Sequence, residues 1–174
     1  MRKYPIYLQD DEISCGVYCI KMILKYYDIE EDTLNIKRKA RMDHTGTTIK
    51  GLVETFKAYA IEAKAYHASL SDIKEHITLP CILHTLEEGI GHFVVLYEIK
   101  EDTYIIGDPA HGIVVYDQEE LASIYTENVV SITHIGRYFE YENKTFKQFL
   151  KEIKKLYHKD IRKLGSYTFF ITLF

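Results

Sequence analysis

Apolar residues in the first third of the chain recur at the spacing of an α-helix. In residues 15 to 27, the apolar side chains that share one helical face are Val17, Ile20, Ile23, Leu24 and Tyr27. Ser14 is a suitable N-cap for this helix, which places Cys15 at the first helical position. Three further helices are predicted, over the stretch DIEEDTLNIKRKARM, over residues 48 to 59 and over the stretch SLSDIKEHI.

The pattern changes to that of β-strands near residue 79. Five short runs rich in β-branched and aromatic residues follow: LPCILHTL, GHFVVLYEI, TYIIGD, GIVVYD and NVVSITHI. Most of the gaps between them have the length of a hairpin loop and contain Gly, Asp or Pro, which predicts antiparallel pairing. Helices followed by such strands predict an α+β fold, in which the helical part packs on a mostly antiparallel sheet.

A basic segment follows the predicted sheet. Between Lys144 and Lys163 there are eight Lys or Arg against two acids, and the apolar residues fall on the opposite face of a helix. We therefore interpret residues 138–164 as a basic amphipathic linker helix of the kind that lies on a membrane surface. The last apolar run, 165–174, is shorter than the roughly 20 residues that cross a bilayer. We interpret it as the start of a transmembrane helix, with a C-terminal strand as the alternative, and residues 1–137 as the main domain.

The charge balance and the cysteine content narrow the class of protein. With 22 Lys and Arg against 26 Asp and Glu, the net charge is −4, so there is no global basic surface for nucleic acid. Three cysteines without the spacing of a disulfide framework, and no signal peptide ahead of MRKYPIYLQ, indicate a reducing, cytoplasmic compartment. No second Cys/His pair at zinc-ligand spacing occurs, and HTGTTIKG lacks the Gly-Lys-Ser/Thr ending of a phosphate loop. We therefore expect no metal or cofactor in the main domain.

Cys15 is the first candidate for chemistry. A thiol acts as a nucleophile only as the thiolate, and the N-terminus of a helix favours that form. Cys19, one turn further on, and Cys81, in a predicted strand, lack this advantage. The structural alternative is that Cys15 is a small core residue, which is common for free cysteines.

A cysteine nucleophile needs a base and a group that orients the base. Of eight histidines, His92 stands out because it opens the strand HFVVLYEI after the flexible stretch EEGIG. If this strand and TYIIGD form a hairpin, Asp108 returns beside His92 and can hold its imidazole in one orientation. His84 and His111 are weaker candidates for the base. The structural alternatives are a partly buried histidine and an ordinary Asp-Pro turn.

Gln9 is the fourth candidate, six residues before Cys15. Its amide N–H groups can donate to an oxyanion together with the backbone N–H of Cys15, and such donors typically contribute strongly to catalysis. A glutamine in a loop is uninformative by itself, so its weight depends on the other three residues.

The order of these motifs resembles the peptidase domain at the N-terminus of bacteriocin-processing and exporting ABC transporters. The resemblance covers residues 4 to 134 and depends on Gln9, then five residues, CG and an apolar helix ending in KYY, followed by GTTIKGL, LPCILH, HFVVLYEI and DPA. It implies a papain-like cysteine endopeptidase. The implied reaction is cleavage of the double-glycine leader of a bacteriocin or pheromone precursor, after Gly-Gly, Gly-Ala or Gly-Ser, coupled to export.

The resemblance also implies a role for each matching position. Cys15 is the implied nucleophile, and His92 is the implied general base and acid. Asp108 is the implied orienting carboxylate, and Gln9 is the implied oxyanion-hole donor. The residue before the cysteine is often Asp in the family and is Ser14 here, which should not touch the chemistry.

Partners and location follow from the same resemblance. The expected partners are the leader peptide and the transmembrane and nucleotide-binding domains of the exporter. Such exporters are homodimeric, and the peptidase domain lies at the cytoplasmic face of the bacterial cell membrane. ATP and Mg²⁺ bind to the nucleotide-binding domain, whose site is absent from these 174 residues. The acids from Asp10 to Glu12 either solvate their loop or help to receive a basic leader.

Two other functions would use the same residues. The first is a non-catalytic domain that only docks the leader for an attached exporter. Loss of the cysteine usually marks that class in the family, and Cys15 is present. The second is a different papain-like enzyme that transfers acyl or amide groups, for which the chain shows nothing beyond the shared mechanism.

Overall fold

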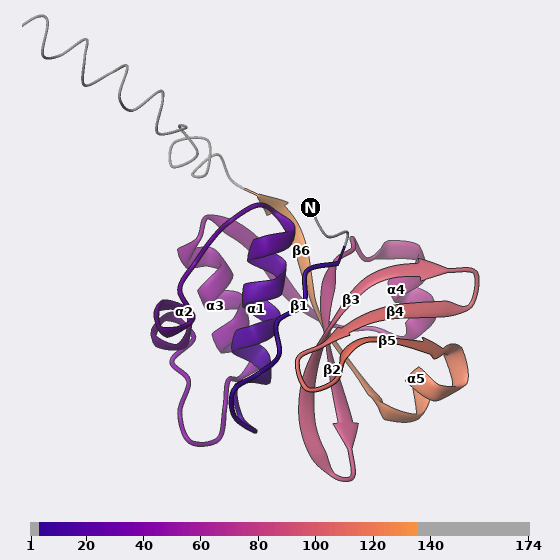
Figure 1. Cartoon of the computed structure of the whole chain (residues 1–174). Coiled ribbons are helices and arrows are strands. Elements are labelled where there is room, and N and C mark those ends of the chain that lie inside the picture. Colours follow the sequence, from indigo (N-terminus) through magenta and orange to yellow (C-terminus); the bar gives the residue numbers. More distant parts are fainter. Residues whose placement is uncertain (1–3, 136–174) are drawn as a thin grey trace, which may run out of the picture. The chain divides into compact units, whose positions relative to one another are not determined.

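The computed structural model describes residues 4–135, which form five helices and a six-stranded sheet (Figure 1). The elements are α1 (Cys15–Tyr26), α2 (Thr33–Lys39), α3 (Ile49–Ala58), β1 (Ile61–His67), α4 (Leu70–His76), β2 (Cys81–Glu87), β3 (Ile90–Lys100), β4 (Thr103–Asp108), β5 (Gly112–Asp117), α5 (Gln118–Ile124) and β6 (Tyr125–Ile135). The segments predicted over 138–164 and 165–174 lie outside the described residues.

Four helices form where the apolar spacing predicts them, and local caps fix where three of them begin. Helix α2 begins later than predicted, at Thr33, because Asp32 has an extended backbone and its side chain accepts a hydrogen bond from the Leu34 N–H. The side chain of Thr48 caps α3 in the same way. Ser69 and Asp72 form a reciprocal capping box at the start of α4.

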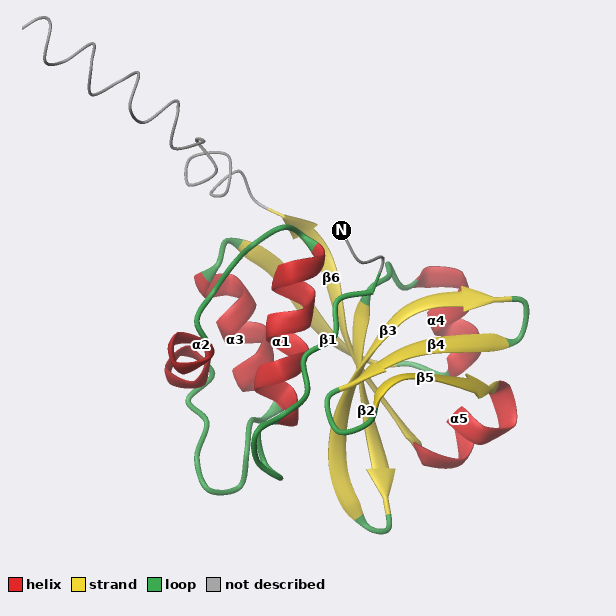
Figure 2. Ribbon diagram, in the orientation of Figure 1, coloured by secondary structure: helices red, strands yellow, loops and turns green. Residues whose placement is uncertain are grey.

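The strands join into one sheet in the order β1-β6-β2-β3-β4-β5, and every paired neighbour is antiparallel (Figure 2). Strands β2 to β5 pair with their neighbours in the chain, whereas β6 returns to lie between β1 and β2. The predicted α+β fold with an antiparallel sheet is therefore confirmed. Strands β1 and β5 are the two edges.

Helices cover both faces of the sheet (Figure 1). On one face, α1 packs on β3 and α3 packs on β1. On the other face, α4 and α5 enclose a core whose main members are Leu70, Ile73, Cys81, Leu83, Val94, Leu96, Tyr104, Ile106, Leu121 and Val129. From Phe93 to Tyr97, strand β3 is buried on both faces, so the chain is held firmly just beyond His92.

The sequence pattern does not predict β1 and α5. Strand β1 lies at an edge and buries only Ile61 and Ala63 of its seven residues. Apolar and polar residues alternate along it, but two of the apolar positions are alanines, which are uncommon in strands, so the pattern is weak. Helix α5 buries only Leu121, and its start is marked by a capping box between Asp117 and Glu120. None of the helices within residues 4–135 is long and apolar enough to cross a membrane.

Candidate active site

Cys15 is the first residue of α1 and is buried, with 8% of its surface exposed. Ser14 occupies the N-cap position, as predicted, but its side chain makes no capping hydrogen bond. Its hydroxyl instead donates to Asp10 Oδ1 at 3.2 Å. Because no cap side chain occupies the N–H groups of the first turn, they remain as donors next to the Cys15 thiol.

His92 and Asp108 come together through the β3–β4 hairpin. The two strands pair in antiparallel register, and Asp108 is the last residue of β4. The Nε2–H of His92 donates to Asp108 Oδ1 at 2.9 Å. Asp108 is fully buried, and 13% of the His92 side chain is exposed. The hairpin expected from the sequence therefore brings this carboxylate to this imidazole.

The protonation of His92 is controlled by its two partners. Burial would lower the pKa of His92, but the hydrogen bonds and charges of Asp108 and Cys15 outweigh burial and raise the pKa to about 10. Nε2 is bound to Asp108, so the other ring nitrogen, Nδ1, is left for a second partner. The imidazole therefore lies between a carboxylate and a thiol, and it favours the charged form.

Asp108 is held as a carboxylate. Burial would raise its pKa, but hydrogen bonds from His92, from His111 and from the backbone N–H of Ala110 lower the pKa to about 2. The Ala110 N–H donates to Oδ1 at 2.7 Å, and His111 Nδ1 lies 3.0 Å from Oδ2. His111, considered as a weaker candidate for the base, is thus hydrogen-bonded to Asp108.

Gln9 lies beside the turn that follows Asp108. Its backbone N–H donates to the carbonyl of Pro109 at 2.8 Å, which joins the N-terminal segment to the end of β4. The Oε1 atom of Gln9 is buried and has no hydrogen-bond partner among residues 4–135. A buried polar atom without a partner is rare in folded proteins, so the position of the Gln9 side chain calls for an explanation.

The acidic loop between Gln9 and Cys15 is paired inside the domain. Lys37 Nζ, on α2, lies 3.1 Å from Asp10 Oδ1 and 3.1 Å from Asp11 Oδ2. Asp10 also accepts the hydrogen bond from Ser14 described above. Asp10 and Asp11 therefore form ion pairs with Lys37, which connect the loop to α2.

Cys19 and His84 make packing and hydrogen-bond contacts outside the candidate site. Cys19 is fully buried, and its Sγ–H donates to the carbonyl of Phe93 at 3.1 Å. Burial, followed by the charges of Cys15 and Asp108, raises the pKa of Cys19. His84 packs on the Phe93 ring at 5.1 Å between centroids, and its Nδ1 lies 2.8 Å from Thr126 Oγ1.

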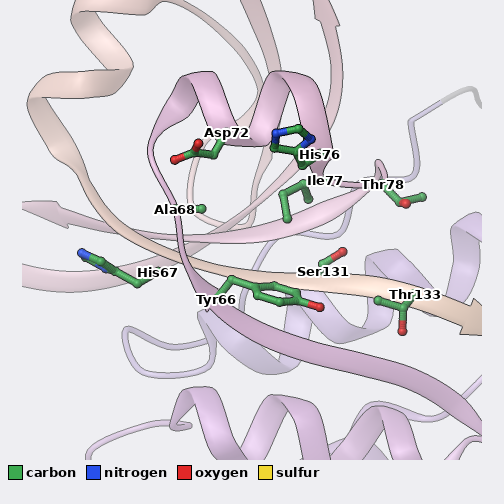
Figure 3. Close-up of a pocket in the computed structure, with 9 residues that line it drawn as sticks. All are labelled: Tyr66, His67, Ala68, Asp72, His76, Ile77, Thr78, Ser131 and Thr133. Carbon is green, nitrogen blue, oxygen red and sulfur yellow. The ribbon is translucent and has the colours of Figure 1, made fainter.

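The hollow in Figure 3 is separate from these residues. It has a volume of about 500 Å³ and lies between β1, α4 and β6. Tyr66 lies on the strand side and His76 on the helix side, and no lining residue belongs to the candidate site. Within residues 4–135, no cluster of three or more His, Cys, Asp or Glu is arranged to hold a metal ion.

Comparison with known proteins supports a common origin with processing transporters. The chain is 38% identical over 109 residues to the lactococcin-G-processing and transport ATP-binding protein LagD of Lactococcus lactis subsp. lactis, covering 62% of this chain and 16% of that protein. It is 29% identical over 125 residues to the colicin V secretion/processing ATP-binding protein CvaB of Escherichia coli, covering 72% of this chain and 17% of that protein. The chain therefore spans less than a fifth of these relatives.

Solved structures show the same fold. A double-glycine-motif protease from an AMS/PCAT transporter, in complex with the leader peptide, has a TM-score of 0.70 and 27% identity, over 75% of this chain and 92% of that one. The peptidase domain of Streptococcus ComA also has a TM-score of 0.70, at 23% identity, over 75% of this chain and 98% of that one. The predicted papain-like peptidase fold is confirmed by these likenesses. The peptidase C39 family matches residues 3–135, and because this match covers most of the sequence, the chain belongs to that family.

Proposed function

We propose that this domain is a cysteine endopeptidase that removes the leader of a bacteriocin or pheromone precursor by cleavage after a Gly-Gly pair. The observation that carries this is the position of His92, which is hydrogen-bonded to buried Asp108 and lies near enough to Cys15, at the start of α1, for that thiol to raise the pKa of the imidazole. The relatives are processing and transport proteins, and one similar structure is a double-glycine protease bound to a leader peptide.

The chemistry assigns one task to each of the four residues. The Cys15 thiolate attacks the carbonyl carbon of the second glycine, and the oxyanion accepts hydrogen bonds from the Gln9 amide and the Cys15 N–H. The His92 imidazolium gives its proton to the departing amine, which leaves an acyl-enzyme thioester and a neutral imidazole. His92 then takes a proton from water, the hydroxide attacks the thioester, and the thiolate departs. Asp108 keeps the imidazole oriented throughout.

An exposed apolar strip on β5 is suited to bind the part of the leader that precedes the glycines. Val114 and Tyr116 pack on the core beneath α4 and α5, so Ile113 and Val115 point to the opposite face. Ile113 is 43% and Val115 58% exposed. Because β5 begins at Gly112, which pairs with Asp108, this strip leads directly away from the candidate site.

Val115→Glu is expected to raise KM for the leader about tenfold while leaving kcat unchanged, because it removes an apolar contact that the bound leader would bury and adds a charge. Steady-state cleavage of a synthetic leader measures both constants. Leu34→Glu is the matched control, since Leu34 is 69% exposed on α2. An equal rise in KM in both variants would show that the effect comes from charge alone.

The remaining partners belong to the same proposal. The domain works beside the transmembrane and nucleotide-binding domains of an exporter, which binds ATP and Mg²⁺ and is a homodimer. The peptidase then lies at the cytoplasmic face of the bacterial cell membrane. This placement agrees with relatives that are processing and transport ATP-binding proteins.

The test is incubation of the folded chain with a synthetic leader peptide that contains a Gly-Gly pair. Mass spectrometry is expected to find a single cut after the second glycine. A peptide with Ala-Ala at the same place is the control and is expected to stay intact, because the proposed specificity depends on excluding any side chain larger than that of glycine. An intact Gly-Gly leader after prolonged incubation would instead favour a domain that docks the leader without cleaving it.

A further inference from the structure

The second oxygen of the Asp108 carboxylate is bound by a histidine that the proposed reaction does not use. His111 lies in the turn between β4 and β5, with Nδ1 3.0 Å from Asp108 Oδ2. His92 and the Ala110 N–H both bind the other oxygen, Oδ1. Among residues 4–135, His111 is the only hydrogen-bond partner of Oδ2.

The contact between His111 and Asp108 differs from a surface ion pair because the carboxylate is buried. Asp108 is 0% exposed, whereas the His111 side chain is 64% exposed. A buried carboxylate oxygen without a hydrogen-bond partner is costly. His111 therefore covers the solvent side of a group that is otherwise enclosed.

The turn itself does not require His111. The Ala110 N–H already bonds to the Asp108 side chain two residues before it, which is the contact that closes a turn of this type. Gly112, with φ of +96°, supplies the left-handed residue that leads into β5. Removal of the His111 imidazole leaves both of these features in place.

We propose that His111 is a positioning residue of the peptidase site, which holds Asp108 Oδ2 so that Oδ1 stays directed at His92. A carboxylate bound through one oxygen can turn about its Cβ–Cγ bond, whereas one bound through both cannot. This role rests on the proposed peptidase function, because it acts through the same carboxylate and imidazole. It adds a fifth residue to the four that the sequence suggests.

The other titratable groups around Asp108 do not replace His111. His92 faces it from β3, Cys19 from α1 and Tyr116 from β5. Cys19 donates to the Phe93 carbonyl, and only His92 of these three forms a hydrogen bond with Asp108. Loss of His111 therefore leaves Oδ2 without a donor from residues 4–135.

His111→Ala is expected to lower kcat about tenfold, the equivalent of one hydrogen bond to a charged group, with KM unchanged. The alkaline limb of the kcat profile is expected to move to lower pH. A carboxylate that turns away from His92 stabilises the imidazolium less, which lowers the pKa of His92. His111→Asn is expected to restore both, because Asn Nδ2 and His Nδ1 are bonded to the same carbon, Cγ. A purely structural role would change the melting temperature and leave the pH limb in place.

His67→Ala is the matched control. The His67 side chain is 71% exposed and its Nε2 lies 3.1 Å from Glu127 Oε2, but Glu127 is itself 54% exposed. Wild-type kinetics in His111→Ala, or an Asn variant as impaired as the Ala variant, would overturn the role. Equal loss of activity in His67→Ala would also overturn it.

Alkylation of Cys15 by iodoacetamide gives a readout without any leader. The rate at neutral pH is expected to fall in His111→Ala and to recover in His111→Asn, because the reactive thiolate depends on the His92 imidazolium. An unchanged rate contradicts the positioning role. If the wild-type chain cleaves no leader but the alkylation rate still depends on His111, the peptidase function is wrong and the positioning of Asp108 stands.

Discussion

Cys15→Ala is expected to abolish leader cleavage, with a loss of at least about 10⁴-fold, while the domain stays folded. The other two thiols cannot take over, because Cys19 and Cys81 are fully buried and burial raises the pKa of both. The substitution removes one sulfur from a side chain that is 8% exposed, which costs about 1 kcal/mol of stability. Mass spectrometry of the leader and thermal melts measure the two effects separately.

Cys81→Ala is the control for this variant. Cys81 lies in the core beneath α4 and α5, on β2, and is expected to lose stability without losing activity. Cleavage by Cys15→Ala at the wild-type rate would place the nucleophile elsewhere. Unfolding of Cys15→Ala would be resolved by Cys15→Ser, which keeps the size of the side chain and lacks the thiolate.

The sequence predicts those elements whose apolar pattern is strong and whose partners are close in the chain. Strands β3 and β4 have compact apolar runs and a short connection, so their pairing and the return of Asp108 to His92 follow from the chain itself. Strand β1 is different, because five of its residues are exposed and two of its alternating apolar positions are alanines, which are uncommon in strands. In its pairing with β6, His67 lies opposite Asn128 and Ile61 opposite Ile135, so the partners are far apart in the chain.

The same distinction applies to the candidate site. Cys15, His92 and Asp108 stand out because each lies at the end or start of a predicted element. His111 is three residues from Asp108, but in the sequence it reads only as another possible base. Its hydrogen bond to Oδ2 depends on the path of the turn.

Lys37 makes contacts that the sequence does not predict. It belongs to the basic face of α2, which in the sequence is an ordinary solvated helix surface. Its contacts with Asp10 and Asp11, 27 and 26 residues earlier, exist only because α2 packs beside α1. A sequence pattern cannot reveal a pair that depends on the packing of two helices.

Asp108→Asn is expected to lower kcat by roughly 10² to 10⁴-fold, because an amide keeps the shape of the carboxylate and loses its charge. The pH profile gives the sharper result. In the wild type, His92 has a pKa of about 10, so it stays protonated through neutral pH, and the alkaline limb of the activity profile reports the loss of this proton. Without the carboxylate, the pKa of His92 is expected to fall toward its ordinary value, and the alkaline limb moves to lower pH.

Asp102→Asn is the matched control for Asp108→Asn, because Asp102 lies in the β3–β4 turn and its side chain is 79% exposed beside Lys74. Its alkaline limb is expected to coincide with that of the wild type. If Asp108→Asn also kept the wild-type limb, the charge of Asp108 would not be what maintains the His92 imidazolium. The Cys15 thiolate would then have to do so alone, and the fall in kcat would reflect only the lost orientation of the ring.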